Sequence, residues 1–172
     1  MAYWAVKRFC TFVRLPEPAM RHDVLFPLPR ISGGTLMHVQ QMIASHPQLR
    51  TSADDALARC VEACYDCAQS CTACMDACLG EEDVKPLIQC IRLNLDCADV
   101  CAAAGAVISR RTGNNREVTM AMLDACALAC NVCGQECDMH GVEHEHCRVC
   151  AEVCHRCEEA CAEALQLLER MQ

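Results

Sequence analysis

The chain has 172 residues, enough for one or two domains, and nineteen of them are cysteines. Its net charge of −8 argues against a nucleic-acid partner, because no basic field is present to hold phosphates. No stretch approaches the ~18 apolar residues of a membrane span, and the charged N-terminal stretch lacks the apolar run of a signal peptide. We therefore expect a cytoplasmic chain whose cysteines stay reduced, which favours metal binding or catalysis over a disulfide scaffold.

The first 36 residues differ from the rest of the chain. They carry a charge of +3, which leaves −11 on the remainder, and they hold five of the six aromatic residues. They show no clear period and end in Ser32-Gly33-Gly34, which is typical of a linker. We predict that residues 1–36 are a poorly ordered extension and that residues 37–172 form the folded domain. A sharper hypothesis is that Met37 is the natural start and that residues 1–36 are not native.

Helix signals follow the linker. A short helix that Thr35 can cap is expected to stop before Pro47. Four long helices of about 25–28 residues come next, bounded by capping residues and glycines. Their expected limits are Thr51-Ser52 to Gly80, Glu82-Asp83 to Gly113, Asn114-Asn115 to Gly141, and Val142 to Arg170. Pro86 is tolerated in a first turn, and Arg110-Arg111 suits the last turn of the second helix.

Short connections between long helices predict an antiparallel up-and-down bundle. The expected fold class is therefore all-α, a four-helix bundle preceded by a short N-terminal helix. There is no strand pattern and no glycine-rich phosphate loop.

The cysteines of the four helices follow a heptad pattern. Every gap within a helix is three, four or seven residues, so these cysteines occupy the positions that face the axis of a bundle. We expect them to line one shared interior as metal ligands. They are Cys60, Cys64, Cys67, Cys71, Cys74, Cys78, Cys90, Cys97, Cys101, Cys126, Cys130, Cys133, Cys137, Cys147, Cys150, Cys154, Cys157 and Cys161.

Two structural explanations fit this pattern poorly. Cysteine packing as a small hydrophobe would sacrifice roughly 1 kcal/mol or more per site relative to leucine, over eighteen sites. Disulfides within a helix would be strained, because side chains three or four residues apart have Cβ atoms about 5–6 Å apart and a disulfide needs about 3.8 Å. The cysteine core is therefore expected to exist for a ligand.

Thiolate is a soft ligand, which leaves Cu(I), zinc and iron–sulfur clusters as candidates. A Cu(I) ion that displaces one thiol proton leaves the charge of the core unchanged, whereas zinc held by four thiolates leaves two negative charges per site. Two neighbouring thiols can also span a Cu(I) ion, whereas zinc needs a tetrahedron, which is usually built with loops. If each thiolate bridges two ions, the core would hold roughly 18 Cu(I) ions.

Other cysteine chemistries remain as alternatives. Cys60, Cys64 and Cys67 match the CxxxCxxC cluster spacing of radical-SAM enzymes, but a cysteine heptad produces this spacing automatically and the alternating pattern of a barrel is absent. The leading alternative to copper binding is an iron–sulfur or redox protein. A zinc or general thiol buffer is a further alternative. No single thiol stands out as a catalytic nucleophile, so we do not expect an enzyme.

Antiparallel topology gives the bundle two different ends. One end collects aliphatic positions of the heptad pattern: Leu57, Ile108, Leu123, Ala164 and Leu168. The other collects the stretch DMHGVEHEHC, whose candidate residues for copper entrance and exit are Met139, His140, His144 and His146.

Three further residues stand near the pattern. Asn94, between Cys90 and Cys97, is expected to hydrogen-bond a sulfur or to fix the register of the helices. His155 is interpreted as a boundary residue, and Cys10 lies outside the pattern.

Four helices with cysteine heptads, the preceding stretch MHVQQMIASHPQ and a histidine-bearing mouth resemble the cytosolic copper storage proteins of bacteria, a family of cysteine-rich four-helix bundles. The resemblance covers about residues 37–172 and does not extend to residues 1–36. It implies that the thiols bind many Cu(I) ions inside a preformed bundle and that the bundles form homotetramers. We expect a copper store or sink that keeps copper away from other thiol and iron–sulfur targets, with copper donors and acceptors that the sequence does not name.

Overall fold

The structure is a computed structural model that describes residues 38–47, 52–113 and 115–171. Its helices are α1 (His38–Ala44), α2 (Ser52–Gly80), the 3₁₀ turn η1 (Lys85–Leu87), α3 (Ile88–Ser109), α4 (Arg116–His140) and α5 (Glu145–Arg170). The described residues contain no strand, so the all-α prediction is confirmed. The predicted extension, residues 1–36, lies outside the described residues, as do the predicted caps Thr35, Thr51 and Asn114.

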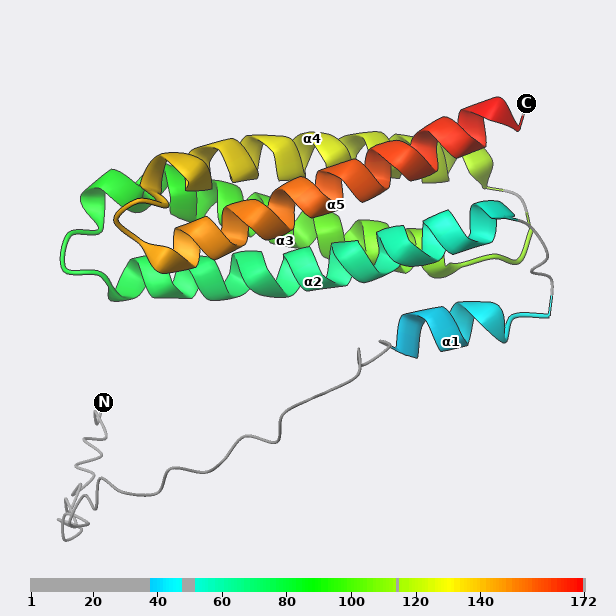
Figure 1. The fold of residues 1–172 in the computed structure, drawn as a ribbon, viewed down its shortest axis with the longest axis horizontal. Coiled ribbons are helices and arrows are strands. Elements are labelled where there is room, and N and C mark those ends of the chain that lie inside the picture. The colour runs from blue at the N-terminus through cyan, green and yellow to red at the C-terminus, as the bar shows by residue number, and fades with distance from the viewer. Residues whose placement is uncertain (1–37, 48–51, 114, 172) are drawn as a thin grey trace, which may run out of the picture. The chain divides into compact units, whose positions relative to one another are not determined.

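Helices α2 to α5 form an antiparallel bundle (Figure 1). Helix α2 packs against α3 and α5, and α4 packs against the same two helices, so neighbours in the chain are neighbours in space. The α2–α3 and α4–α5 connections lie at one end of the bundle, and the α3–α4 connection lies at the other. The predicted up-and-down topology is confirmed.

The short helix α1 ends at Ala44, before Pro47 as predicted, and packs against α2. Ile43 of α1 is buried and joins the bundle core. Gln40 Nε2 donates a hydrogen bond of 2.8 Å to Glu62 Oε2 on α2. Apolar contacts of Ile43 and Val39 and the hydrogen bond from Gln40 thus hold α1 to the bundle.

The predicted start of α3 at Glu82-Asp83 is wrong. Asp83 Oδ1 accepts the Lys85 backbone N–H at 3.2 Å, and the Leu87 N–H bonds to Val84 O at 3.0 Å, which makes a turn with 3₁₀ spacing. Pro86 lies in this turn, where its missing N–H leaves no hydrogen bond unmade. The α-helix proper therefore begins at Ile88.

Two other predicted helix limits are wrong for related reasons. Arg110, predicted to lie in the last turn of α3, follows the helix in an extended conformation, because α3 closes at Ser109. Helix α5 begins at Glu145 rather than Val142, because the N–H groups of Glu143 and His144 both bond to His140 O and form a tight turn. Gly113 has the positive φ of 81° that favours glycine, but it lies beyond the end of α3 at Ser109, so the predicted helix end at this glycine is also wrong.

The bundle core consists largely of cysteine. Its few large buried aliphatic side chains include Leu57, Val61, Leu87, Ile108 and Leu123, each at most 3% exposed. Of the described helices, α4 alone combines the length and mean hydropathy (1.3) of a membrane span. Its cysteines face the bundle interior, and core helices of globular proteins pass the same test, so this hydropathy does not indicate a span.

Candidate metal centre

The structure brings all eighteen cysteines of the four long helices into one core. None is more than 2% exposed, and all eighteen are free thiols. The heptad spacing explains this placement, because a residue every three or four positions stays on one face of a helix. The predicted site residues are therefore together, while their binding of metal stays a prediction. We call these eighteen residues, listed above, the cysteine core.

The sulfur atoms of the cysteine core lie in mutual contact across helices. Cys67 of α2 shows the pattern best: its Sγ lies 3.8 Å from Cys97 Sγ on α3, 3.8 Å from Cys130 Sγ on α4 and 3.7 Å from Cys154 Sγ on α5. The shortest sulfur–sulfur distances, Cys60–Cys161 and Cys101–Cys130, are both 3.4 Å, far beyond the roughly 2.05 Å of a disulfide bond. One residue thus bridges all four helices through sulfur.

Groups of four sulfurs follow one another along the bundle. In each group the four donor atoms lie within 4.8 Å of one another, and successive groups share Cys67 or Cys71. Three such groups are Cys67-Cys97-Cys101-Cys130, Cys67-Cys71-Cys97-Cys154 and Cys71-Cys133-Cys150-Cys154. Because groups share ligands, the sulfurs form a continuous column, which suits metal ions bridged by thiolates.

This geometry corrects one argument made from the sequence. Straight helices were expected not to build a tetrahedron of thiolates, yet the donors of one group come from three different helices. Zn–S bonds of about 2.3 Å require sulfurs about 3.8 Å apart, which the column provides. Charge is therefore what separates the metals: adjacent zinc sites with four thiolates would place several net negative charges in a dry interior.

Asn94 is a fully buried polar side chain among the sulfurs. Its Nδ2 donates to Cys90 O at 2.9 Å and contacts Cys90 Sγ at 3.3 Å and Cys137 Sγ at 3.5 Å. Its Oδ1 accepts the Cys150 thiol at 3.1 Å. The predicted hydrogen bond between Asn94 and a sulfur is confirmed, and it links α3 to α4 and α5.

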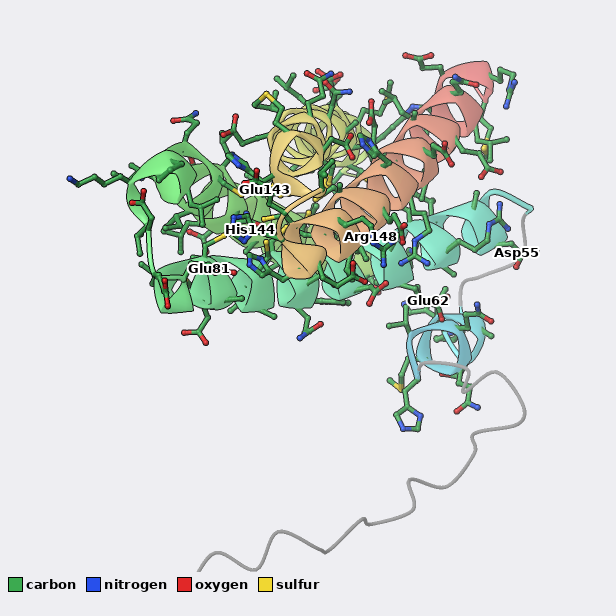
Figure 2. All side chains as sticks on the ribbon, turned by 60° about the vertical axis from the view of Figure 1, so that its left-hand side comes forward. Asp55, Glu62, Glu81, Glu143, His144 and Arg148 are labelled. Atoms are coloured by element: carbon green, nitrogen blue, oxygen red, sulfur yellow. The ribbon has the colours of Figure 1, made fainter. Side chains whose placement is uncertain are left out.

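One end of the bundle carries the α2–α3 and α4–α5 connections, and we call it the histidine end. Polar side chains lie against the thiols there. His146 Nδ1 lies 3.5 Å from Cys74 Sγ and 3.4 Å from Cys147 Sγ, and its Nε2 lies 3.1 Å from Glu81 Oε1. The same Glu81 oxygen accepts from His144 Nδ1 at 2.9 Å. Figure 2 shows Glu81 and His144 close together at this end.

The four candidate entrance residues differ in what their side chains contact. Among the described residues, His146 is the histidine whose ring contacts cysteine sulfur, and His144 lies beside it with ring centroids 5.5 Å apart. His140 turns instead to Glu136 Oε1, 3.3 Å away and one turn back on α4. Met139 is exposed on the surface. The structure thus groups His144 and His146 at the thiols and sets the other two apart.

Glu81 is the functional candidate that sequence reasoning missed. It follows Gly80 directly, at the end of α2, and antiparallel topology places that end beside the start of α5. A carboxylate at a helix end opposite two histidines was the signal that could have found it. Hydrogen bonds from His146 and then His144 lower the pKa of Glu81, so its carboxylate is ionised at neutral pH and can only accept hydrogen bonds.

Two thiols of the histidine end, Cys78 and Cys147, are held protonated in the absence of metal. Burial raises the pKa of Cys78 to about 11, and burial likewise raises the pKa of Cys147. A metal ion that binds here must therefore displace protons, which makes binding dependent on pH.

The opposite end, here called the aliphatic end, closes with hydrocarbon side chains. Leu57, Ile108, Leu123 and Ala164 are each at most 3% exposed, and Leu168 packs against them while partly exposed. No histidine of the described residues contacts a sulfur at this end. The predicted contrast between the two ends is present in the structure.

Two remaining features lie away from the cysteine core. His155 bridges α4 and α5 on the surface, with Nε2 2.8 Å from Asp138 Oδ2, which agrees with its interpretation as a boundary residue. Cys10 lies outside the described residues.

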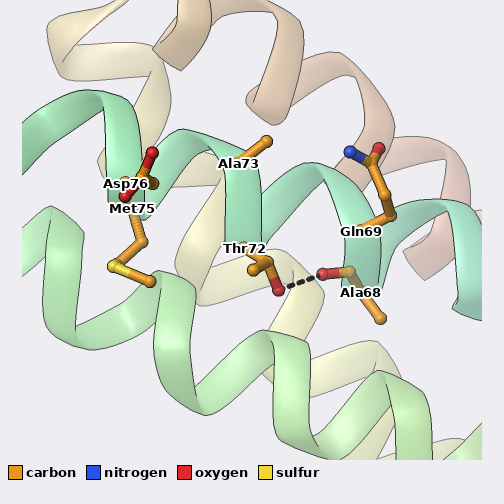
Figure 3. A pocket seen from close by; sticks show the side chains of 6 residues that line it. All are labelled: Ala68, Gln69, Thr72, Ala73, Met75 and Asp76. Carbon is orange, nitrogen blue, oxygen red and sulfur yellow. Dashed lines mark hydrogen bonds between the residues drawn. The ribbon is translucent and has the colours of Figure 1, made fainter. Parts of the chain in front are cut away.

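A surface groove of about 550 Å³ on α2 has no cysteine or histidine in its lining (Figure 3), so it is not an opening to the sulfur column.

Comparison with known proteins relates the chain to copper storage proteins. A sequence model of the copper storage protein family matches residues 53–166. The structure is similar to that of a copper storage protein from Streptomyces lividans loaded with 10 copper equivalents, with 52% identity and a TM-score of 0.72 over 74% of this chain and 98% of that chain. It is also similar to the metal-free copper storage protein 3 of Bacillus subtilis, with 36% identity and a TM-score of 0.53 over 62% of this chain and 96% of that chain.

A curated relative adds a partial match. The chain is 39% identical over 74 residues to an uncharacterized cysteine-rich protein of Bacillus subtilis (strain 168). The match covers 43% of this chain and 62% of that protein.

Proposed function

Because the chain belongs to the copper storage protein family, we propose that it stores Cu(I) in the interior of its four-helix bundle, bound by the thiolates of the cysteine core. The role is that of a non-enzymatic store or sink. It keeps Cu(I) from other thiols and from iron–sulfur clusters, and it reserves metal for acceptors.

The continuous sulfur column is the observation that carries this proposal. Cys67 and Cys71 each belong to more than one group of four sulfurs, so neighbouring ions would share thiolates. One Cu(I) per displaced proton keeps the interior neutral, which is the arrangement that a dry core tolerates. We infer a capacity near one copper per cysteine of the core, roughly 18 ions, by soft-ligand counting.

The histidine end is the proposed entrance and exit for copper. His146 reaches the sulfurs and also lies partly exposed, with 22% of its side chain accessible. It can therefore accept an ion from solvent or from a donor protein and pass it to Cys74, Cys78 or Cys147. His144 supports it through the shared Glu81 carboxylate. Met139 and His140 lie apart from the thiols, so we do not assign them to the transfer of copper into the cysteine core.

The location and assembly are part of the proposal. A relative from Streptomyces lividans is described as a cytosolic copper storage protein, and a cytoplasmic location would keep eighteen thiols reduced. We propose a homotetramer, by resemblance to the family, with copper donors and acceptors as its partners and neither nucleic acid nor membrane among them.

An anaerobic titration of reduced, metal-free protein with Cu(I) against a competing chelator tests this function. Uptake of about one copper per core cysteine that resists the chelator is the expected result. Saturation at one or two ions would overturn it and would direct attention to the iron–sulfur and zinc alternatives. Colour separates these at once, because a Cu(I)–thiolate core is colourless in the visible and an iron–sulfur cluster is brown.

A further inference from the structure

One group of donors at the histidine end differs from the sulfur column in its chemistry. It combines three thiols, Cys74, Cys78 and Cys147, with the imidazole of His146, and its four donor atoms lie within 4.8 Å of one another. The ring Nδ1 lies 3.5, 3.9 and 3.4 Å from the three sulfurs in that order. Cys147 Sγ lies 3.9 Å from Cys74 Sγ and 4.0 Å from Cys78 Sγ.

These distances match a tetrahedral zinc site. Zn–S bonds of about 2.3 Å and a Zn–N bond of about 2.0–2.1 Å give sulfurs about 3.8 Å apart and a nitrogen about 3.6 Å from each sulfur. The five distances given above depart from this geometry by a few tenths of an ångström. Small rotations of the side chains would close them around one ion.

Glu81 supplies the support that a ligating histidine needs. Its ionised carboxylate accepts the Nε2–H of His146 at 3.1 Å, so the lone pair of the ring lies on Nδ1, the nitrogen that faces the sulfurs. The same Oε1 atom accepts from His144 and is thereby held in place. A carboxylate behind a ligating imidazole is the usual second layer of a zinc site.

Charge favours this group over the sulfur column for a divalent ion. Three thiolates and one neutral imidazole around Zn²⁺ leave a net charge of −1, whereas four thiolates leave −2. The group also lies at the end of the bundle, where His146 reaches solvent, so that the remaining charge is better hydrated than it would be in the interior. Three thiol protons leave for solvent when the ion binds.

We propose that Cys74, Cys78, Cys147 and His146 form one tetrahedral Zn²⁺ site at the histidine end, with Glu81 as the residue that positions His146. This site goes beyond copper storage, since it takes a divalent ion at a single place. An ion held here lies across the end through which copper is proposed to pass.

A titration of the reduced, metal-free full chain with Co²⁺, a spectroscopic substitute for Zn²⁺, tests the site. We expect one tightly bound Co²⁺ per chain with a tetrahedral spectrum and thiolate-to-metal bands, displaced by one Zn²⁺. The His146→Ala variant should bind Co²⁺ at least tenfold more weakly, with its d–d bands shifted. His140→Ala is the matched control, because His140 turns to Glu136, and it should match the unaltered chain.

Substitution of Glu81 separates positioning from ligation. Glu81→Leu should weaken Co²⁺ binding by about 10-fold or more, while Glu81→Gln, which keeps an acceptor oxygen, should lose less. In the metal-free chain, the ¹⁵N shifts of His146 should report a proton on Nε2, and Glu81→Leu should shift that tautomer. Equal binding in all three proteins would overturn the positioning role.

X-ray absorption of the zinc-loaded unaltered chain needs no variant. Three sulfurs and one nitrogen around zinc are expected, and four sulfurs would overturn the proposal even if His146→Ala failed to fold. Binding of several Co²⁺ ions with spectra of four thiolates, or no tight binding, would also overturn it. Copper capacity is measured separately on the unaltered chain, so failure of the zinc site and failure of copper storage are distinguishable.

Discussion

The two ends of the bundle are built from opposite kinds of side chain on the same helical frame. At the aliphatic end, Leu57 and Leu123 are at most 3% exposed and fill the space between helices with hydrocarbon. At the histidine end, His146 stands where an aliphatic plug would otherwise be, between solvent and the thiols of Cys74 and Cys147. Most of the large buried aliphatic side chains thus lie at one end, with Leu87 at the start of α3 as the exception, and the histidine that contacts thiols lies at the other.

This difference follows from what each end contributes without metal. A buried leucine contributes about 1.5–3 kcal/mol through burial, and a cysteine contributes less because its side chain is smaller. The aliphatic end can hold the helices together without metal, and we expect the thiol-rich remainder to gain cohesion from the proposed copper ions. Substitutions at each end can test this difference.

The largest effect is expected at the aliphatic end. Leu123→Ala removes a fully buried side chain of α4 and should lower the free energy of unfolding of the metal-free protein by about 2–5 kcal/mol. Copper capacity should be unchanged. Chemical denaturation measures the first quantity and Cu(I) titration the second.

Leu128→Ala is the matched control on the same helix. Leu128 is 65% exposed, so its truncation should change the free energy of unfolding by no more than about 0.5 kcal/mol. Equal destabilisation by the two variants would remove the structural role assigned to the aliphatic end.

A smaller loss is expected from Asn94→Ala, within the cysteine core. The substitution removes bonds to Cys90 and Cys150 and leaves a small cavity, so the metal-free protein should lose about 1–3 kcal/mol of unfolding free energy. The exposed Gln89→Ala on the same helix is the control. If both variants unfold at the same denaturant concentration as the unaltered chain, Asn94 does not link the helices.

His146→Ala should act on the rate of copper loading rather than on the fold. We expect loading to slow about tenfold, equivalent to about 1.4 kcal/mol in the barrier. Replacing His140, His144 and His146 together should slow it further while sparing capacity, and stopped-flow mixing with a Cu(I) donor complex measures these rates.

Leu57→Ala at the aliphatic end provides the comparison for loading. Copper that enters at the histidine end should load this variant at the unaltered rate, provided that it remains folded. Faster loading of Leu57→Ala, or unchanged loading of the three-histidine variant, would place the entrance elsewhere.

The smallest effect is expected at the surface bridge of His155. Its hydrogen bond to Asp138 raises the pKa of His155 above the usual value of 6.5. The bridge should therefore stabilise the fold fully below about pH 6.5, and the contribution should be lost as the pH rises through the raised folded-state pKa. Solvent screens this exposed pair, so His155→Gln should cost only a few tenths of a kcal/mol near pH 6 and less near pH 9.

Thermal denaturation at the two pH values measures the difference. Asp138→Asn should reduce the same pH dependence, because the main charge that raises the pKa of His155 is then absent while Glu158, 3.6 Å from the ring Nδ1, remains. A cost of His155→Gln that is equal at both pH values would mean that the ring stabilises the fold by packing alone.

Local signals in the sequence predicted most of this structure. The gaps between Cys60 and Cys78 determine which face of α2 turns inward, because helical periodicity depends only on positions along one helix. The same periodicity predicted four helices, and short connections predicted their antiparallel order. Helix limits at Glu82, Arg110 and Val142 were wrong, because side-chain and backbone hydrogen bonds in the turns decided them.

Contacts between helices required the tertiary structure. No periodicity links Glu81 to His144 and His146, which lie more than sixty positions away, and no spacing rule separates His140 from the other two histidines. The groups of four sulfurs likewise draw ligands from three helices, and their distances depend on how the helices pack. The sequence alone determined that a thiol-lined bundle would form, because that depends on which face each helix buries. Only the tertiary structure decided which donors meet, because their separation depends on the packing of several helices at once.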